Sequence, residues 1–220
     1  VISAYQPKSV LLQVLFDPES RLTDSLTYDI TAWALPFAHG LDAVAVRDRL
    51  EARIRIEPYT AAEAKPATAP YAWCIRRGAM ADAIFLGHVL QQDIKVRYAT
   101  RSFESGEQRF DAGTLVINRA DNRSMEGDLD AAIRAAARYA NVALVPVFTG
   151  FADKGNDLGS EAFNLVRNGD IGLFYGDDVD ENSYGQIWYH FERELGYPLV
   201  ALPVDKINRV ALHDFSVLIL

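Results

Sequence analysis

The sequence predicts an α/β protein: a mixed-sheet α/β unit followed by part of a second, parallel sheet. From Tyr71 onward, short apolar segments typical of strands alternate with helical patterns. Residues 168–220 then follow the order strand, helix, strand, strand. The composition is ordinary for a globular protein, with 50% hydrophobic and 24% charged residues among 220. The first two observations favour an α/β class, and the third rules out collagen, a coiled coil and long disorder.

The N-terminal part predicts two helices and one strand, too few elements to close a core. Residues 6–16 have an amphipathic helical pattern. Residues 28–40 are rich in apolar side chains, although Pro36 should kink or shorten their helix. Residues 41–46 predict a strand. We interpret residues 1–60 as the end of an upstream domain or a linker from it.

The middle of the chain, residues 70–150, predicts a small α/β domain. Residues 61–70, rich in Ala, Pro and Thr, predict a linker or exposed loop before it. Strands are expected at residues 71–75, 95–99, 114–118 and 142–147, helices at 79–91 and 128–139, and a hairpin at 103–110. Residues 150–168 contain Gly and Asp and predict a connection.

The C-terminal part, residues 168–220, predicts the first half of another α/β domain. Strands are expected at residues 170–175, 199–203 and 215–220, with a helix at 183–195. This order is that of the opening of a doubly wound sheet. Because termini usually lie at the surface and this apolar strand ends the sequence, we expect a segment of a longer chain.

Charge and cysteine content exclude several classes of function. The formal charge of -8 disfavours a polyanion such as nucleic acid as a partner. No run of about 18 apolar residues predicts a membrane span. The single cysteine, Cys74, excludes an internal disulfide, and its strand setting predicts a buried thiol rather than a nucleophile.

Histidines do not form a recognisable metal motif, since neither HExxH nor HxxE occurs. The four histidines are His39, His88, His190 and His213. We expect His88 and His190 to be packed or surface residues. A loop salt bridge with Asp214 is the simpler interpretation of His213, and a hydrolase using Asp177 or Asp178 with His213 is a remote alternative.

A first candidate ligand site is the turn formed by Gly176, Asp177 and Asp178. It follows a predicted strand and precedes a predicted helix, where ligands bind in open α/β sheets. Two adjacent carboxylates repel phosphate and suit a divalent cation. An ordinary solvated turn is the simpler interpretation.

A second candidate is a cation loop containing Asp153, Asn156 and Asp157. Carboxylate and amide oxygens can ligate calcium, but the spacing does not match the twelve-residue loop with a terminal Glu. Asx turns with a helix cap at Ser160 explain the same composition more simply.

Several segments together resemble the region downstream of the catalytic domain in bacterial zinc carboxypeptidase-like proteins. They are residues 1–7 (VISAYQP), 28–36 (YDITAWALP), 110–118 (FDAGTLVIN), 157–160 (DLGS) and 171–176 (IGLFYG). The later part resembles a class I glutamine amidotransferase-like, flavodoxin-like domain, with residues 184–188 (YGQIW) opening its first helix. The resemblance covers most of the chain in order.

The resemblance implies an accessory, non-catalytic segment. The family's zinc ligands, substrate-binding Arg and general-base Glu belong to the upstream domain, so no catalytic residue and no cofactor is expected here. Zinc is expected in that catalytic domain, which would hydrolyse C-terminal peptide bonds. The implied partners are this peptidase domain of the same chain and the peptide substrate, and the implied location is periplasmic or secreted.

An alternative function is a binding module for a small molecule or carbohydrate, without enzymatic activity. Five aromatic residues could line its groove: Trp33, Trp73, Trp188, Tyr184 and Tyr189. Aromatic residues at such spacings are also typical of a core. Two or more coplanar, exposed rings would favour the binding module.

Overall fold

The computed structural model describes residues 2–17, 34–38, 41–48, 50, 60–61, 66–78, 80–125 and 128–220. Contacts divide the chain into two compact units, Val1–Tyr59 and Thr60–Leu220. We treat each unit by itself.

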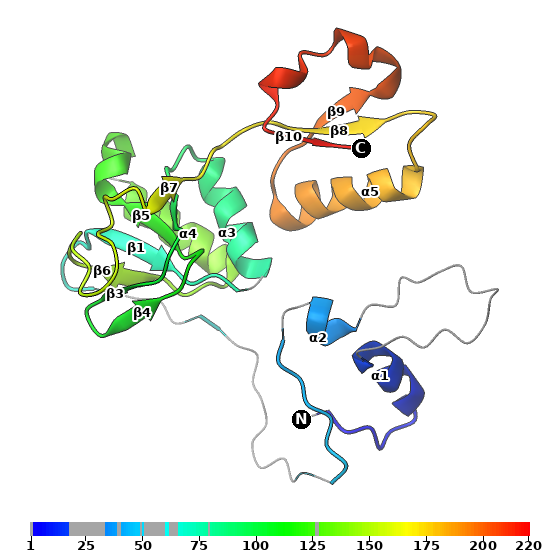
Figure 1. The fold of residues 1–220 in the computed structure, drawn as a ribbon, viewed down its shortest axis with the longest axis horizontal. Helices are drawn as coiled ribbons and strands as arrows, with labels where there is room; N and C mark the ends of the chain where they lie inside the picture. Colours follow the sequence, from blue (N-terminus) through cyan, green and yellow to red (C-terminus); the bar gives the residue numbers. More distant parts are fainter. Residues whose placement is uncertain are drawn as a thin grey trace. The chain divides into compact units, whose positions relative to one another are not determined.

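The first unit contains the helices α1 (Ser9–Phe16) and α2 (Leu35–Ala38) (Figure 1). Most of the helix predicted at 28–40 lies outside the described residues, as do residues 28–33 of the resemblance. The strand predicted at 41–46 is wrong, because these residues are exposed and form no strand. A short strand is stable only when a neighbouring strand pairs with it.

The second unit begins with a five-stranded sheet in the order β6-β1-β5-β2-β7. Its strands are β1 (Ala72–Ile75), β2 (Arg97–Ala99), β5 (Leu115–Asn118), β6 (Val145–Val147) and β7 (Phe163–Leu165). All neighbouring pairs are antiparallel, which corrects the predicted mixed sheet. The reason is topological. β5 lies between β1 and β2, so these two strands do not pair with each other. The β–α–β unit that they begin and end is therefore split.

Two helices and a hairpin cover this sheet on opposite faces. The helices are α3 (Met80–Leu90) and α4 (Leu129–Ala140), and the hairpin joins β3 (Phe103–Ser105) to β4 (Gln108–Phe110). Trp73 and Ile117 pack toward the helices, in one core with Phe85 of α3. The opposite core contains Cys74 beneath the hairpin's Phe110. A sheet buried on both faces explains the continuous apolar runs of its central strands.

The second sheet is parallel and has the order β10-β8-β9. It consists of β8 (Ile171–Tyr175), β9 (Val200–Pro203) and β10 (Val217–Ile219), with α5 (Glu181–Tyr189) beside β8 in Figure 1. The helix continues as a π-helical turn, η2 (His190–Leu195). The predicted parallel strands are thus confirmed.

Three short 3-10 segments, η1 (Arg119–Met125), η3 (Val204–Arg209) and η4 (Leu212–Asp214), connect these elements. None was predicted.

A close joint connects α3 to the end of η2. A Cβ placed on Gly87 would lie 2.7 Å from the backbone oxygen of Leu195, so these elements meet without a side chain between them. The amide of Asn168 donates to the carbonyl of Leu90 at 3.0 Å, and the hydroxyl of Tyr197 donates to the Asn168 side chain at 2.9 Å. One close backbone approach and two side-chain hydrogen bonds therefore connect α3 to η2 and to the segments on either side of the parallel sheet's first strand and helix.

A membrane-spanning helix is not found in the described residues, because none of their helices is long and apolar enough.

Candidate functional site

The turn after β8 lies where the strand order of the parallel sheet reverses. β9 pairs with one side of β8 and β10 with the other, and ligands bind outside the carboxyl ends of strands at such points. Gly176 has φ +137°, and its carbonyl accepts a hydrogen bond from Val179 at 3.0 Å. Asp177 and Asp178 are both exposed beside it. The sequence-predicted turn thus occupies the expected position.

Asp180, which the sequence analysis missed, is the acidic residue after this turn whose side chain accepts a backbone hydrogen bond. Its Oδ1 accepts the Ser183 backbone N–H at 2.7 Å and caps α5. That hydrogen bond lowers the pKa of the Asp180 carboxyl. The helix consequently begins at Glu181, two residues before the predicted start. The sequence feature that could have predicted this helix start is an Asp at the capping position, three residues before Ser183.

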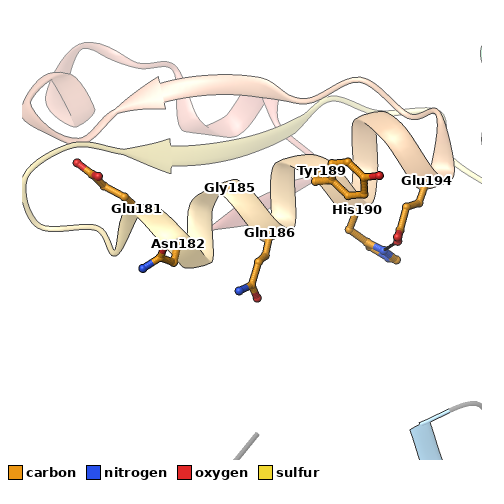
Figure 2. A pocket seen from close by; sticks show the side chains of 7 residues that line it. All are labelled: Glu181, Asn182, Gly185, Gln186, Tyr189, His190 and Glu194. Carbon is orange, nitrogen blue, oxygen red and sulfur yellow. Dashed lines mark hydrogen bonds and ion pairs between the residues drawn. The ribbon is translucent and has the colours of Figure 1, made fainter. Parts of the chain in front are cut away.

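The outer face of α5 and η2 carries a hollow of about 480 Å³. Its lining comprises Glu181, Asn182, Gly185, Gln186, Tyr189, His190 and Glu194. Figure 2 shows Asn182, Gln186 and His190 pointing away from the parallel sheet. They lie four residues apart and therefore share one helix face.

The chemistry of this hollow is polar. His190 Nδ1 lies 2.7 Å from Glu194 Oε2. Beyond its chain neighbours and its own helix backbone, nothing lies within 4 Å of a Cβ position on Gly185. The exposed ring of Tyr189 adds an apolar surface at its edge. Amide, carboxylate and ring together can hold a neutral, hydroxyl-rich ligand.

In the predicted cation loop, one of the three predicted ligands hydrogen-bonds to the backbone of the loop itself. Asp157 Oδ1 accepts the Ala152 N–H at 2.9 Å, while Asp153 and Asn156 are exposed. Ser160 caps no helix, because strand β7 follows it, and its buried hydroxyl has no hydrogen-bond partner. Within the described ranges, no group of three or more His, Cys, Asp or Glu side chains is placed to hold a metal ion.

Among the described residues, the aromatic side chains predicted for a groove do not form one binding platform. Trp73 is 1% exposed, so it belongs to the core, as the simpler interpretation predicted, and lines no groove. The Tyr184 ring packs 6.0 Å from that of Tyr175. Trp188 and Tyr189 are exposed, but neighbouring helical residues point about 100° apart. Trp33 lies outside the described residues.

Two histidines, His213 and His88, contact neighbouring side chains away from the candidate turn. His213 lies 3.3 Å from Asp214, which confirms the predicted loop salt bridge. The ring of His88 lies 4.1 Å from the Tyr139 ring, between α3 and α4. These contacts support no general base beside Asp177 or Asp178.

Cys74 is completely buried, as the sequence predicted, and burial raises the pKa of its thiol to about 12. A thiol that stays protonated is a poor nucleophile. We therefore expect no labelling by iodoacetamide at about pH 8 in the native chain, and complete labelling in urea, read by mass spectrometry. Rapid labelling of the native chain would contradict this burial.

An ion pair that the sequence analysis missed joins β2 to η1. Arg97 Nε donates to Asp121 Oδ2 at 2.7 Å, and this hydrogen bond lowers the pKa of the Asp121 carboxyl. A lowered pKa stabilises the fold above the unfolded value of about 3.9, and this contribution disappears as the pH falls through the folded value. No spacing in the sequence indicates a pair so far apart.

Asp121→Asn should accordingly lower the stability near neutral pH and weaken its dependence on acid. The measurement is urea unfolding at neutral pH and below pH ~3. Asp205→Asn, on the surface of η3, is the matched control. An identical acid dependence in Asp121→Asn and the unmodified chain would contradict the role of this ion pair.

Comparisons with known proteins add no family assignment. A scan against protein-family models, a search of curated proteins and a search of solved structures each found no match.

Proposed function

We propose that this chain is a non-catalytic accessory part of a zinc carboxypeptidase-like protein. The observation that supports it is where the resembling segments lie. Residues 114–117 lie in and beside β5, at the centre of the antiparallel sheet, and residues 171–175 form β8, at the centre of the parallel sheet. Two of the resembling segments therefore form central strands of the second unit.

The strand order of the parallel sheet supports the finer part of this proposal. Numbered along the chain, its order is 2-1-3, which is how a flavodoxin-like sheet begins. An amidotransferase-like domain has that kind of sheet. In this proposal zinc and its ligands belong to an upstream peptidase domain of an exported protein, and the present chain braces that domain or binds its peptide substrate.

The first test is to sequence the coding DNA on both sides of this chain. We expect an upstream HxxE and a further His, the ligand pattern of the zinc domain. A reading frame without them would overturn the proposal. The second test compares peptide hydrolysis by the longer protein and by this chain alone, both supplied with zinc. Hydrolysis by this chain alone would contradict its accessory role.

A second candidate function, a carbohydrate or small-molecule binding module, is favoured by the hollow on α5. Titration with neutral oligosaccharides, followed by NMR shifts of Gln186 and Asn182 side-chain amides, tests it. Shifts confined to the hollow would support binding, and unchanged spectra at millimolar ligand would contradict it.

A further inference from the structure

The segment that connects the two sheets of the second unit contains the dipeptide Asn168-Gly169. It follows β7 and precedes β8, and Figure 1 shows it joining the antiparallel sheet to the parallel one. Asn-Gly occurs once in the sequence. In this dipeptide the following backbone nitrogen attacks the side-chain amide most readily, because glycine has no side chain to hinder the approach. The segment therefore contains the asparagine of this chain that is most prone to lose its amide.

The attacking nitrogen is not engaged in the structure. Within the described residues, the Gly169 N–H donates no hydrogen bond. Asn168 and Asp170 on either side of it are exposed, so solvent reaches this segment. A Cβ added to Gly169 would collide with the Ser216 side chain, so the position requires glycine for packing. The sequence that favours the reaction is thus also the sequence that the fold needs.

The Asn168 side chain is part of the joint between α3 and η2. Its Nδ2 donates at 3.0 Å to the carbonyl of Leu90, the last residue of α3. Its Oδ1 accepts at 2.9 Å from the hydroxyl of Tyr197, which follows the C-cap of η2. The same hydroxyl lies 2.8 Å from the Gly169 carbonyl. One amide group therefore bridges α3 and the segment after η2.

We propose that Asn168-Gly169 is a deamidation site, and that its conversion to aspartate or isoaspartate loosens the joint between α3 and η2. The Gly169 nitrogen bonds to Asn168 Cγ and loses its proton to hydroxide. The Cγ–Nδ2 bond breaks, and the departing nitrogen takes a proton from water and leaves as ammonia. Water then adds to either carbonyl of the cyclic imide and breaks its bond to the nitrogen. In sum, one water is consumed and one ammonia released, without oxidation or reduction.

The aspartate product loses the contact with α3. A carboxylate only accepts hydrogen bonds, so it repels the Leu90 carbonyl to which the Asn168 amide donates. Leu90 also lies at the C-terminal end of α3, where the helix dipole disfavours negative charge. The Tyr197 hydroxyl can still donate to a carboxylate. The joint therefore opens on the side of α3.

The isoaspartate product also changes the backbone. Its chain runs through the former side chain and is one atom longer between residues 168 and 169. Gly169 is packed against Ser216, whose N–H donates to the Asp170 carbonyl at 2.9 Å. The segment cannot accommodate an additional atom there without moving.

Peptide mass spectrometry of the unmodified chain tests the reaction. After prolonged incubation in mildly alkaline buffer, we expect Asn168 to be the first asparagine to exchange its NH2 for OH, with isoaspartate among the products. Asn182 is the matched internal control, because it is exposed and precedes a small residue, Ser183. The Ser183 N–H, however, donates to Asp180 Oδ1 at 2.7 Å, so Asn182 should stay intact. An intact Asn168, or conversion of Asn182 ahead of it, would overturn the proposal.

Hydrogen exchange of the Asp93 and Tyr197 amides tests the loosening of the joint. Asp93 follows α3 and Tyr197 follows η2, and each amide donates a backbone hydrogen bond on its own side. We expect both to exchange about tenfold faster in the converted chain and in Asn168→Asp, the change produced when the closed joint loses ~1.4 kcal/mol. Asn208→Asp adds the same charge at an exposed position of η3 and should leave both rates unchanged.

The outcomes distinguish a loosened joint from an effect of charge alone. Conversion of Asn168 with unchanged exchange of both amides would overturn the loosening. Equal acceleration by Asn168→Asp and Asn208→Asp would overturn it as well, since the effect would then come from net charge. Converted and unconverted chains of the unmodified sequence are compared directly, so the result does not depend on whether Asn168→Asp folds. Both readouts use this chain alone and are independent of the proposed accessory function.

Discussion

Trp73→Ala should lower the free energy of unfolding of the second unit by about 3–5 kcal/mol, the usual cost of deleting a buried aromatic side chain. The Trp73 side chain is 1% exposed and lies between β1 and the helices α3 and α4. Its Nε1–H donates to Asp130 Oδ1 at 2.8 Å, and the Arg134 guanidinium lies 5.0 Å from its ring. The substitution removes packing, a hydrogen bond and a cation–π contact together.

Urea unfolding followed by far-ultraviolet circular dichroism measures this loss without relying on tryptophan fluorescence. Trp188→Ala is the matched control, because Trp188 is 40% exposed on α5 and should cost less than ~1 kcal/mol. Trp73→Phe should be intermediate, since it keeps most of the packing but removes the donor to Asp130. Equal losses for Trp73→Ala and Trp188→Ala would contradict the position of Trp73 in the core.

Alanine substitutions at two mid-helix glycines should have opposite effects on stability. Gly87→Ala introduces a Cβ 2.7 Å from the Leu195 backbone oxygen, so the joint between α3 and η2 must shift. Overpacking of this kind costs about 1–3 kcal/mol. In Gly185→Ala the new Cβ meets nothing within 4 Å beyond its chain neighbours and its own helix backbone, so the substitution should stabilise α5 by about 0.5–1 kcal/mol through helix propensity.

The two variants control for each other, because the residue exchange and the secondary structure are the same. Urea unfolding gives both changes in stability, and hydrogen exchange of Leu195 and Tyr197 amides reports on the joint itself. We expect faster exchange there in Gly87→Ala and no change in Gly185→Ala. Stabilisation by both substitutions would contradict the close approach at Gly87.

Several candidate-site features could be predicted from the sequence because they depend on neighbouring residues. The turn at Gly176 follows a strand of five residues, and an Asp beside Gly commonly forms such a turn. The burial of Cys74 follows from the apolar strand around it. By contrast, the ion pair of Arg97 with Asp121 depends on segments distant in the sequence, so no local pattern could predict it.

The sequence by itself determined the local elements of the second unit: the central strands, the helices α3 and α4, and the hairpin of β3 and β4. Their periodicity and turn residues act within a few positions of the chain. Only the tertiary structure decided that β5 separates β1 from β2, that β7 exists, and that residues 41–46 form no strand. A strand of three residues is stabilised by hydrogen bonds to its neighbours, and those neighbours are chosen by packing across the whole unit.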